Sequence, residues 1–247
     1  EFQVELVHGA NRFIGAAFDK DHQIQGRSEE IIVFYNPSAA INPNMFILSI
    51  GVSNYLDQNI RLKYAASDAR EITGIMKDVS LGLYDTIYPQ SLVDKDASKQ
   101  NILQHFKRLV EQVNPIDTVI IYLAGHGITE NGIYYYFPCD VDITDIENTC
   151  ISLSDIEQLI KKMPANKIAI FLDTCQSGSA VKSLGEVALS RGIEDRRILA
   201  NLAKNSGIAV FSAANETQSA IEIFALEHGI FTYCVIYILE NRKSEII

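Results

Sequence analysis

Residues 117–127 read DTVIIYLAGHG, an apolar run that ends in a histidine between two glycines. A continuous apolar run predicts a strand that is buried on both faces, here over residues 117–124. Similar runs predict strands over 45–52, 167–172 and 208–212, and weaker patterns predict strands over 86–92 and 133–137. Apolar residues at helical spacing predict helices over 62–79, 99–113, 154–163 and 231–240. Strands that alternate with helices predict an α/β fold, a mostly parallel sheet flanked by helices.

The first 36 residues have a different pattern. Short strand-like runs at 4–7 and 30–35 predict the end of a β-sandwich-like module. This stretch is similar to the closing strands of bacterial immunoglobulin-like modules. Residues 37–44 are rich in Asn and Pro and are expected to form a linker. The predicted organisation is therefore a short β-rich N-terminal fragment (1–36), a linker (37–44) and one large domain (45–247).

The composition limits the classes of partner. The chain has 247 residues and a formal net charge of −10, which argues against a nucleic-acid partner because such surfaces need clustered Lys and Arg. No apolar run approaches the ~20 residues that span a bilayer, so no membrane partner is expected. Four cysteines without CxxC or zinc-like spacing favour reduced thiols and a cytoplasmic location. Because the first residue is not Met, we expect that upstream domains of a longer chain are missing.

Two predicted strand ends carry groups for nucleophilic chemistry. His126 follows the strand over 117–124, and Cys175 follows the strand over 167–172. The carboxyl ends of parallel strands lie at one sheet edge, where ligands bind, so we expect the thiol and the imidazole to meet. Together they form a cysteine nucleophile with its acid–base partner. The backbone N–H groups of Gly127 and Cys175 are expected to hold the oxyanion.

Each of these residues also has a structural interpretation. His126 alone is typical of a hydrogen-bonded histidine at a strand end, and a lone cysteine is usually a buried, inert thiol. The polar Asp, Thr, Gln and Ser around Cys175 argue against burial in an apolar core. The other three cysteines, Cys139, Cys150 and Cys234, are expected to be inert core thiols, since a free Cys packs as a small apolar residue.

These motifs resemble those of caspase-like cysteine peptidases. The stretch DTCQSG at 173–178 is similar to the D-x-C-H-S-G pattern of metacaspases, and LAGHG at 123–127 is similar to their S-G-H-G. His126 lies 49 residues before Cys175, close to the caspase spacing of about 50. Residues 47–52 and 62–69 are similar to the family's first strand and its L-x-x-C-x-x-D-A helix start. The resemblance covers about residues 45–240 and is to the bacterial members, also called orthocaspases.

The resemblance implies a caspase-like fold and hydrolysis of peptide bonds in a protein or peptide substrate, with no cofactor. Its departures are Ala65, Ala124 and Gln176, which stand where the family has Cys, Ser and His. The implied substrate-binding residues of the primary pocket are Asp68, Asp173, Ala124 and Ser212. Two carboxylates there would attract Arg or Lys. The structural alternative for Asp68 is a helix-capping box with Glu71.

We therefore expect a cysteine endopeptidase that cuts after Arg or Lys. One alternative is a caspase-like pseudoenzyme or signalling scaffold, and the other is a peptidase with Asp specificity. No metal site is expected, although calcium is the alternative to a solvated loop for the acidic cluster Asp140, Asp142, Asp145 and Glu147. The polar stretch 182–197 is either a surface connection or a self-cleavage segment, with Lys182, Arg191, Arg196 and Arg197 as its basic residues.

Overall fold

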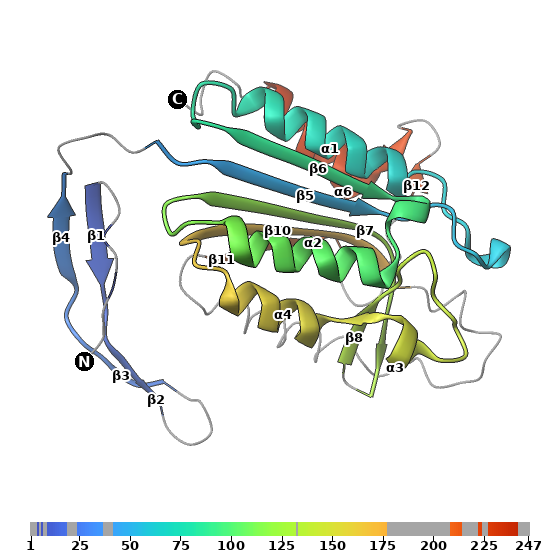
Figure 1. Ribbon diagram of the computed structural model, residues 1–247, viewed down its shortest axis with the longest axis horizontal. Coiled ribbons are helices and arrows are strands. Elements are labelled where there is room, and N and C mark those ends of the chain that lie inside the picture. Colours follow the sequence, from blue (N-terminus) through green and yellow to red (C-terminus); the bar gives the residue numbers. More distant parts are fainter. Residues whose placement is uncertain are drawn as a thin grey trace. The chain divides into compact units, whose positions relative to one another are not determined.

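The computed structural model (Figure 1) describes residues 4, 6, 9–18, 24–36, 42–131, 133–176, 208–213, 222–223 and 227–241. The chain divides into two compact units, residues 1–43 and residues 44–247. Within the described ranges, no helix is both long enough and apolar enough to cross a membrane.

The N-terminal unit contains two antiparallel strand pairs. β1 (Gly9–Phe13) pairs with β4 (Ile31–Tyr35), and β2 (Ala16–Phe18) pairs with β3 (Ile24–Arg27). The amide of Asn11 donates to one main-chain carbonyl of β1 and to one of β4, which links the two strands. These residues therefore form β structure, and their assignment to a sandwich-like module stays a prediction.

A mostly parallel sheet forms the centre of the larger unit (Figure 1). Its spatial order is β11-β10-β7-β5-β6, and every neighbouring pair along this path is parallel. β8 pairs antiparallel with β7, and β9 pairs antiparallel with β8. The strands are β5 (Met45–Gly51), β6 (Ile87–Val93), β7 (Thr118–Glu130), β8 (Ile133–Tyr136), β9 (Ile151–Ser152), β10 (Lys167–Gln176) and β11 (Ile208–Ser212). A separate antiparallel pair joins β12 (Glu222–Ile223) to β13 (His228–Gly229).

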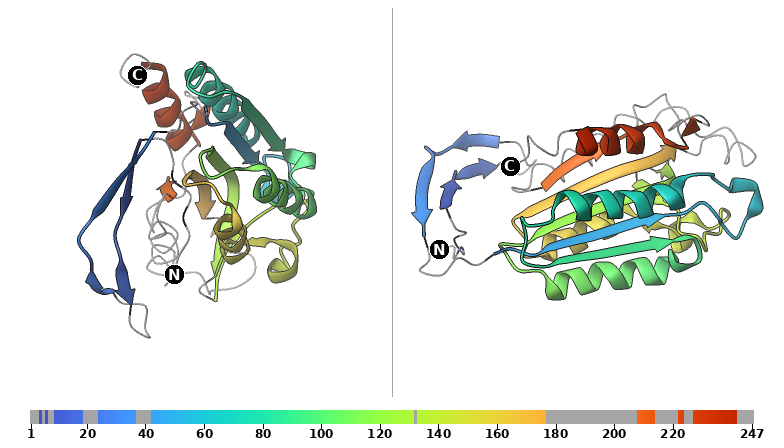
Figure 2. Two further views of the ribbon diagram at one scale, coloured as in Figure 1. Left: turned by 60° about the vertical axis from the view of Figure 1, so that its left-hand side comes forward. Right: turned by 90° about the horizontal axis from the view of Figure 1, so that it is seen from above.

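Helices cover both faces of this sheet (Figure 2). α1 (Ala65–Val79) and α6 (Ile230–Asn241) pack together on one face, and α2 (Lys99–Gln112) and α4 (Leu153–Lys162) pack together on the other. The alternation of β5 serves both layers, because Met45 and Ile47 join the core on one face while Phe46, Leu48 and Ile50 join the core on the other. The remaining short helices are η1 (Gln58–Ile60), η2 (Asp94–Asp96) and α3 (Ile146–Thr149). The predicted α/β fold, with a mostly parallel sheet flanked by helices, is confirmed.

Two predicted helix starts are wrong. α1 begins at Ala65 and not at residue 62, because the hydroxyl of Ser53, in the loop after β5, accepts the Ala66 N–H at 2.9 Å. α4 begins at Leu153, one residue before the predicted start, because Ser152 and Asp155 form a capping box there. Ser152 is the residue at which β9 ends, so the extended strand passes directly into the helix.

Two strands are longer than predicted, and this changes where the candidate site lies. β7 continues through residue 130 because its last four residues pair with β8. β10 continues through residue 176, paired with β7 along its whole length. His126 and Cys175 therefore lie within strands and not just beyond their ends, so a regular ladder fixes their backbones.

Candidate active site

His126 and Cys175 occupy paired positions on neighbouring strands. The parallel register of β7 and β10 sets Cys175 opposite His126, with the pairs Thr174–Gly125 and Gln176–Gly127 on either side. Paired positions on neighbouring strands lie about 4.7–4.9 Å apart across the ladder. The register thus brings the two predicted catalytic residues together although they are far apart in sequence.

Hydrogen bonds of the ring and of the backbone both hold His126 in place. Its Nε2 lies 2.9 Å from the carbonyl oxygen of Ile60, and its backbone N–H donates to the hydroxyl of Tyr55 at 2.8 Å. The ring is 93% buried, between the rings of Tyr55 and Phe137 at centroid distances of 5.3 and 6.3 Å. A carbonyl oxygen can only accept, so Nε2 carries the hydrogen. In the neutral ring, Nδ1 is then the nitrogen with a lone pair that can take a proton.

Close packing against tyrosines explains the glycines on either side of His126. Gly125 has a φ of +143°, and a Cβ there would lie 2.8 Å from the Tyr55 hydroxyl. A Cβ at Gly127 would overlap the Tyr134 hydroxyl, which itself donates to Thr174 on β10 at 2.5 Å. The structure gives both glycines a packing role. The oxyanion role of the Gly127 and Cys175 amides stays a prediction.

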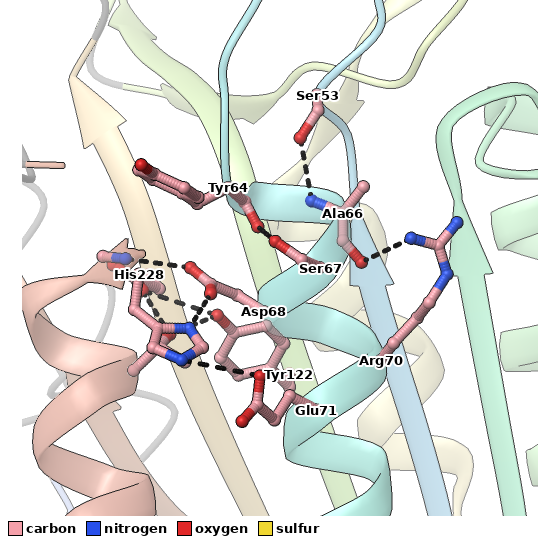
Figure 3. Close-up of polar contacts among 12 residues, drawn as sticks. Ser53, Tyr64, Ala66, Ser67, Asp68, Arg70, Glu71, Tyr122 and His228 are labelled. Atoms are coloured by element: carbon pink, nitrogen blue, oxygen red, sulfur yellow. Dashed lines mark hydrogen bonds and ion pairs between the residues drawn. The ribbon is translucent and has the colours of Figure 1, made fainter. Parts of the chain in front are cut away.

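The two predicted pocket acids lie close together: Asp68 is on α1 beside His228 (Figure 3), and Asp173 is bonded by Thr232 of α6. Asp68 and Asp173 are 2% and 6% exposed. A Cβ built on Gly229 would lie 2.8 Å from Asp173 Oδ2 and 3.4 Å from Asp68 Oδ2, so both carboxylates face this glycine. Asp68 lies within the first turns of α1, and the N-cap of that helix is Tyr64. The alternative of a capping box with Glu71 is therefore wrong.

Asp173 receives a chain of hydroxyl donors. Thr232 at the start of α6 donates to Asp173 Oδ2 at 2.5 Å, and the Tyr122 hydroxyl lies 2.5 Å from the Thr232 hydroxyl. Each hydroxyl has one hydrogen, so Tyr122 donates to Thr232 while Thr232 donates to the carboxylate. Burial raises the pKa of Tyr122 well above its ordinary value, which keeps this donor protonated. The arrangement stabilises a negative charge on Asp173.

Asp68 receives its bonds from β13. His228 Nδ1 lies 2.6 Å from Asp68 Oδ1, and the Gly229 N–H donates to Asp68 Oδ2 at 3.0 Å. Burial raises the pKa of Asp68 to about 6, although the bonds from His228 and Gly229 lower it, and the charge of Asp173 adds to the rise. Ionisation of the buried Asp68 carboxyl group therefore lowers the stability of the fold.

This cost predicts a pH dependence of stability. The pKa of Asp68 in the fold, about 6, lies above the ordinary Asp value near ~3.9. Between these values the native state keeps a proton that the unfolded chain has lost, so stability falls as pH rises through this window. The amide side chain of Asp68→Asn cannot ionise, so we expect this variant to avoid the pH-dependent loss. The loss is on the order of 3 kcal/mol in the free energy of unfolding over the whole window. Urea unfolding of both chains at pH 4.5 and 7 measures the difference. Parallel pH profiles would contradict the burial of an ionisable Asp68.

The remaining predicted pocket residues have different positions. Ala124 is buried, lies opposite Asp173 in the register, and accepts a hydrogen bond from Tyr136 at its carbonyl, 2.9 Å away. Ser212 is exposed at the end of β11, opposite Leu172. The structure therefore brings Ala124 next to the acid pair, while Ser212 lies on the edge strand.

The acidic cluster after β8 is used for loop contacts. Asp140 accepts the Lys99 N–H at the start of α2, Asp142 accepts from Thr144, and Asp145 accepts from Asn148. In the described part of the chain, no group of three or more His, Cys, Asp or Glu side chains is arranged to hold a metal ion. The basic residues of the suggested self-cleavage segment, Lys182, Arg191, Arg196 and Arg197, lie outside the described residues.

Two of the three other thiols match the predicted inert core residues, and one does not. Cys139 and Cys150 are buried, and burial raises their pKa to about 11 and about 12. Cys234 is exposed, so its prediction as a core thiol is wrong. It lies on the outer side of α6, where an apolar helix presents Tyr233 and Tyr237 at the surface as well.

These environments predict an order of alkylation. A thiolate is the reactive form, and a neighbouring imidazole favours it, so we expect iodoacetamide to modify Cys175 first. Cys234 should follow because it is exposed, and Cys139 and Cys150 should react only after unfolding. Peptide mapping after a short treatment measures the order. Faster labelling of Cys234 than of Cys175 would contradict an activated thiol at position 175.

Sequence reasoning missed four residues that hold this site: Tyr55, Ile60, Thr232 and His228. Nothing in the loop that contains Tyr55 and Ile60 marks them as partners of His126, since one acts through a backbone carbonyl. His228 had a signal, because His228-Gly229 repeats the His-Gly dipeptide at 126–127 directly before an apolar helix.

The fold and the site define a class of protein, an α/β domain with a Cys and a His at paired positions of a parallel sheet. The model of the caspase domain family matches residues 45–246, and the chain belongs to this family, whose members are cysteine peptidases. Within known proteins, the chain is similar to Metacaspase-1 of Yarrowia lipolytica, with 29% identity over an alignment of 131 residues. The match covers 48% of this chain and 26% of that relative, so it spans about a quarter of the relative's length.

Solved structures show the same fold. The chain is similar to protein GSU0716 from Geobacter sulfurreducens, with a TM-score of 0.57 and 14% identity. The similarity covers 81% of this chain and 83% of the other. At this level of identity, the likeness concerns the fold alone.

Proposed function

We propose that the chain is a cysteine endopeptidase that cuts proteins or peptides after Arg or Lys through a Cys175–His126 dyad. One observation carries the proposal: the register that pairs Cys175 with His126, whose Nε2 is bonded to the Ile60 carbonyl. That bond orients the ring and fixes the tautomer in which Nδ1 can accept and return a proton. Nothing in the proposed chemistry requires a cofactor.

The proposed reaction has two steps. In the first, the Cys175 thiolate attacks the scissile carbonyl carbon, a C–S bond forms, and His126 gives its proton to the leaving amine as the C–N bond breaks. The amides of Gly127 and Cys175 hold the negative oxygen between these events. In the second step, water loses a proton to His126 and attacks the thioester, which releases the acid and restores the thiolate.

The acid pair supports the proposed preference for a basic residue. Asp68 lies on α1. Asp173 lies on β10, two residues before the nucleophile. Their charges are poorly solvated, so a cation between them gains more Coulomb energy than the ~1 kcal/mol available in bulk water at 4 Å. Arg should be preferred to Lys, because its planar guanidinium can bond both carboxylates at once.

A panel of fluorogenic peptides that differ only in the residue before the reporter group tests this function. The proposal expects the highest kcat/KM for Arg, a lower value for Lys and none for Asp. Cleavage after Asp would replace the basic preference with caspase-like specificity. A folded chain that cleaves no member of the panel would make the domain a binding or signalling scaffold.

A further inference from the structure

One short segment, residues 228–232, supplies hydrogen-bond donors to both pocket acids. From His228 to Thr232 it supplies an imidazole and a backbone N–H to Asp68, and a hydroxyl to Asp173. These contacts join α1 and β10 to β13 and the start of α6, more than fifty residues away in sequence in each case. The acids that a basic substrate would need are therefore already occupied by the chain itself.

The same segment also blocks access to the acids. Only 2% of Asp68 and 6% of Asp173 is exposed, and the Gly229 backbone lies against both carboxylates. A basic side chain can reach Asp68 only if a group of the segment gives up its contact.

His228 is the group best suited to give way. Its imidazole lies between two carboxylates, with Nδ1 2.6 Å from Asp68 and Nε2 3.5 Å from Glu71 (Figure 3). The His228 side chain is 16% exposed and that of Glu71 is 50% exposed, so this side of the pocket faces solvent. A cation arriving from solvent would meet Glu71 first and then the position that the imidazole holds. Among the described residues, Asp173 on β10 and Tyr122 on β7 are further charged or titratable groups close to this point.

We propose that His228 is a specificity-determining residue: it is the internal hydrogen-bond partner of Asp68 in the acidic pocket, and a substrate's guanidinium or ammonium group must displace it from Asp68. This inference rests on the proposed preference for basic residues. A side chain therefore binds in the pocket only if its contacts with Asp68 outweigh the contact that His228 loses. Groups without a positive charge cannot replace the bonds that Asp68 loses when the imidazole leaves, so they are rejected.

Binding of agmatine, a guanidinium amine without a scissile bond, tests the displacement without any turnover. Each variant is made in the Cys175→Ala chain, and calorimetric titration measures the agmatine affinity at pH 7. His228→Ala removes the competitor and should tighten binding about tenfold or more. His228→Lys supplies a permanent cation and should weaken binding below that of the parent. His105 is a half-buried histidine on α2 whose ring bonds Asn101 in its own helix. His105→Ala is therefore the matched control and should leave the agmatine affinity unchanged.

Unfolding midpoints measured for the same proteins separate competition from loss of structure, and His228→Gln serves where His228→Ala unfolds. Tighter binding in the Ala or Gln variant, lost again when Asp68→Asn is added, supports the proposal. Equal or weaker binding in both variants overturns it, because His228 would then only orient Asp68. The proposed function fails separately, through cleavage after Asp in the fluorogenic panel, whatever the agmatine titration shows.

Discussion

Cys175→Ala should abolish cleavage of every reporter peptide, a loss on the order of 10⁴-fold or more. Alanine keeps the backbone of β10, so the ladder with β7 and the position opposite His126 remain. What disappears is the only atom proposed to form the acyl-enzyme bond. The kcat/KM for an Arg reporter measures the effect, and the free energy of unfolding should stay within about 0.5 kcal/mol of the parent, as for a change that leaves no large cavity.

Cys234→Ala is the matched control for this change, because it removes an exposed thiol on α6 and should leave activity intact. His126→Ala should cost about as much as Cys175→Ala, and the double variant should be no worse than either, because residues that act as one unit are not additive. Full activity in Cys175→Ala, or losses that multiply in the double variant, would contradict the dyad.

Asp173→Asn should lower kcat/KM for Arg reporters by more than tenfold. The amide has nearly the same shape, and its oxygen can still accept from Thr232, so the fold around the pocket should persist. The charge is lost, however, and leaving a buried cation without its partner typically costs about 3–5 kcal/mol. The ratio of kcat/KM for Arg to that for an uncharged residue measures the change in specificity.

Asp117→Asn is the control for burial of a carboxyl group. Asp117 is also fully buried, but it lies just before β7 at the opposite end of the strand and accepts from the backbones of Asn44 and Asn114. Its loss should lower stability and leave the Arg preference unchanged. Equal preference for Arg in the parent and in Asp173→Asn would remove Asp173 from the pocket.

The sheet and its helices could be predicted from the sequence because their signals are local. β5, β6, α2 and β11 begin within one residue of the predicted positions, since apolar runs and helical periodicity are properties of the neighbouring residues themselves. The start of α1 could not be predicted in this way. The Ala66 N–H in its first turn donates to the hydroxyl of Ser53, thirteen residues earlier, and no pattern within the helix contains that information.

The candidate site likewise combines residues that local patterns predict with residues that they do not predict. The Cys and the His were predicted because they adjoin strong strand patterns, and both acids were predicted from the resemblance to metacaspases. The sequence did not identify what holds them. The Ile60 carbonyl reaches His126 across 66 residues, and His228 reaches Asp68 across 160 residues. Such pairs depend on the packing of loops onto the sheet, which periodicity does not encode. The continuation of β7 and β10 past their apolar runs was missed because their last residues are polar or glycine.

Reaction with a peptidyl-arginine chloromethyl ketone tests the central claim most directly, because the reagent needs both a basic pocket and an activated thiol. Mass spectrometry of the labelled chain should show a single adduct, on Cys175, and the His126→Ala chain should label far more slowly. The corresponding peptidyl-aspartate reagent should not react at this position. An adduct on another residue, or an active chain that the arginine reagent leaves unmodified, would contradict the account.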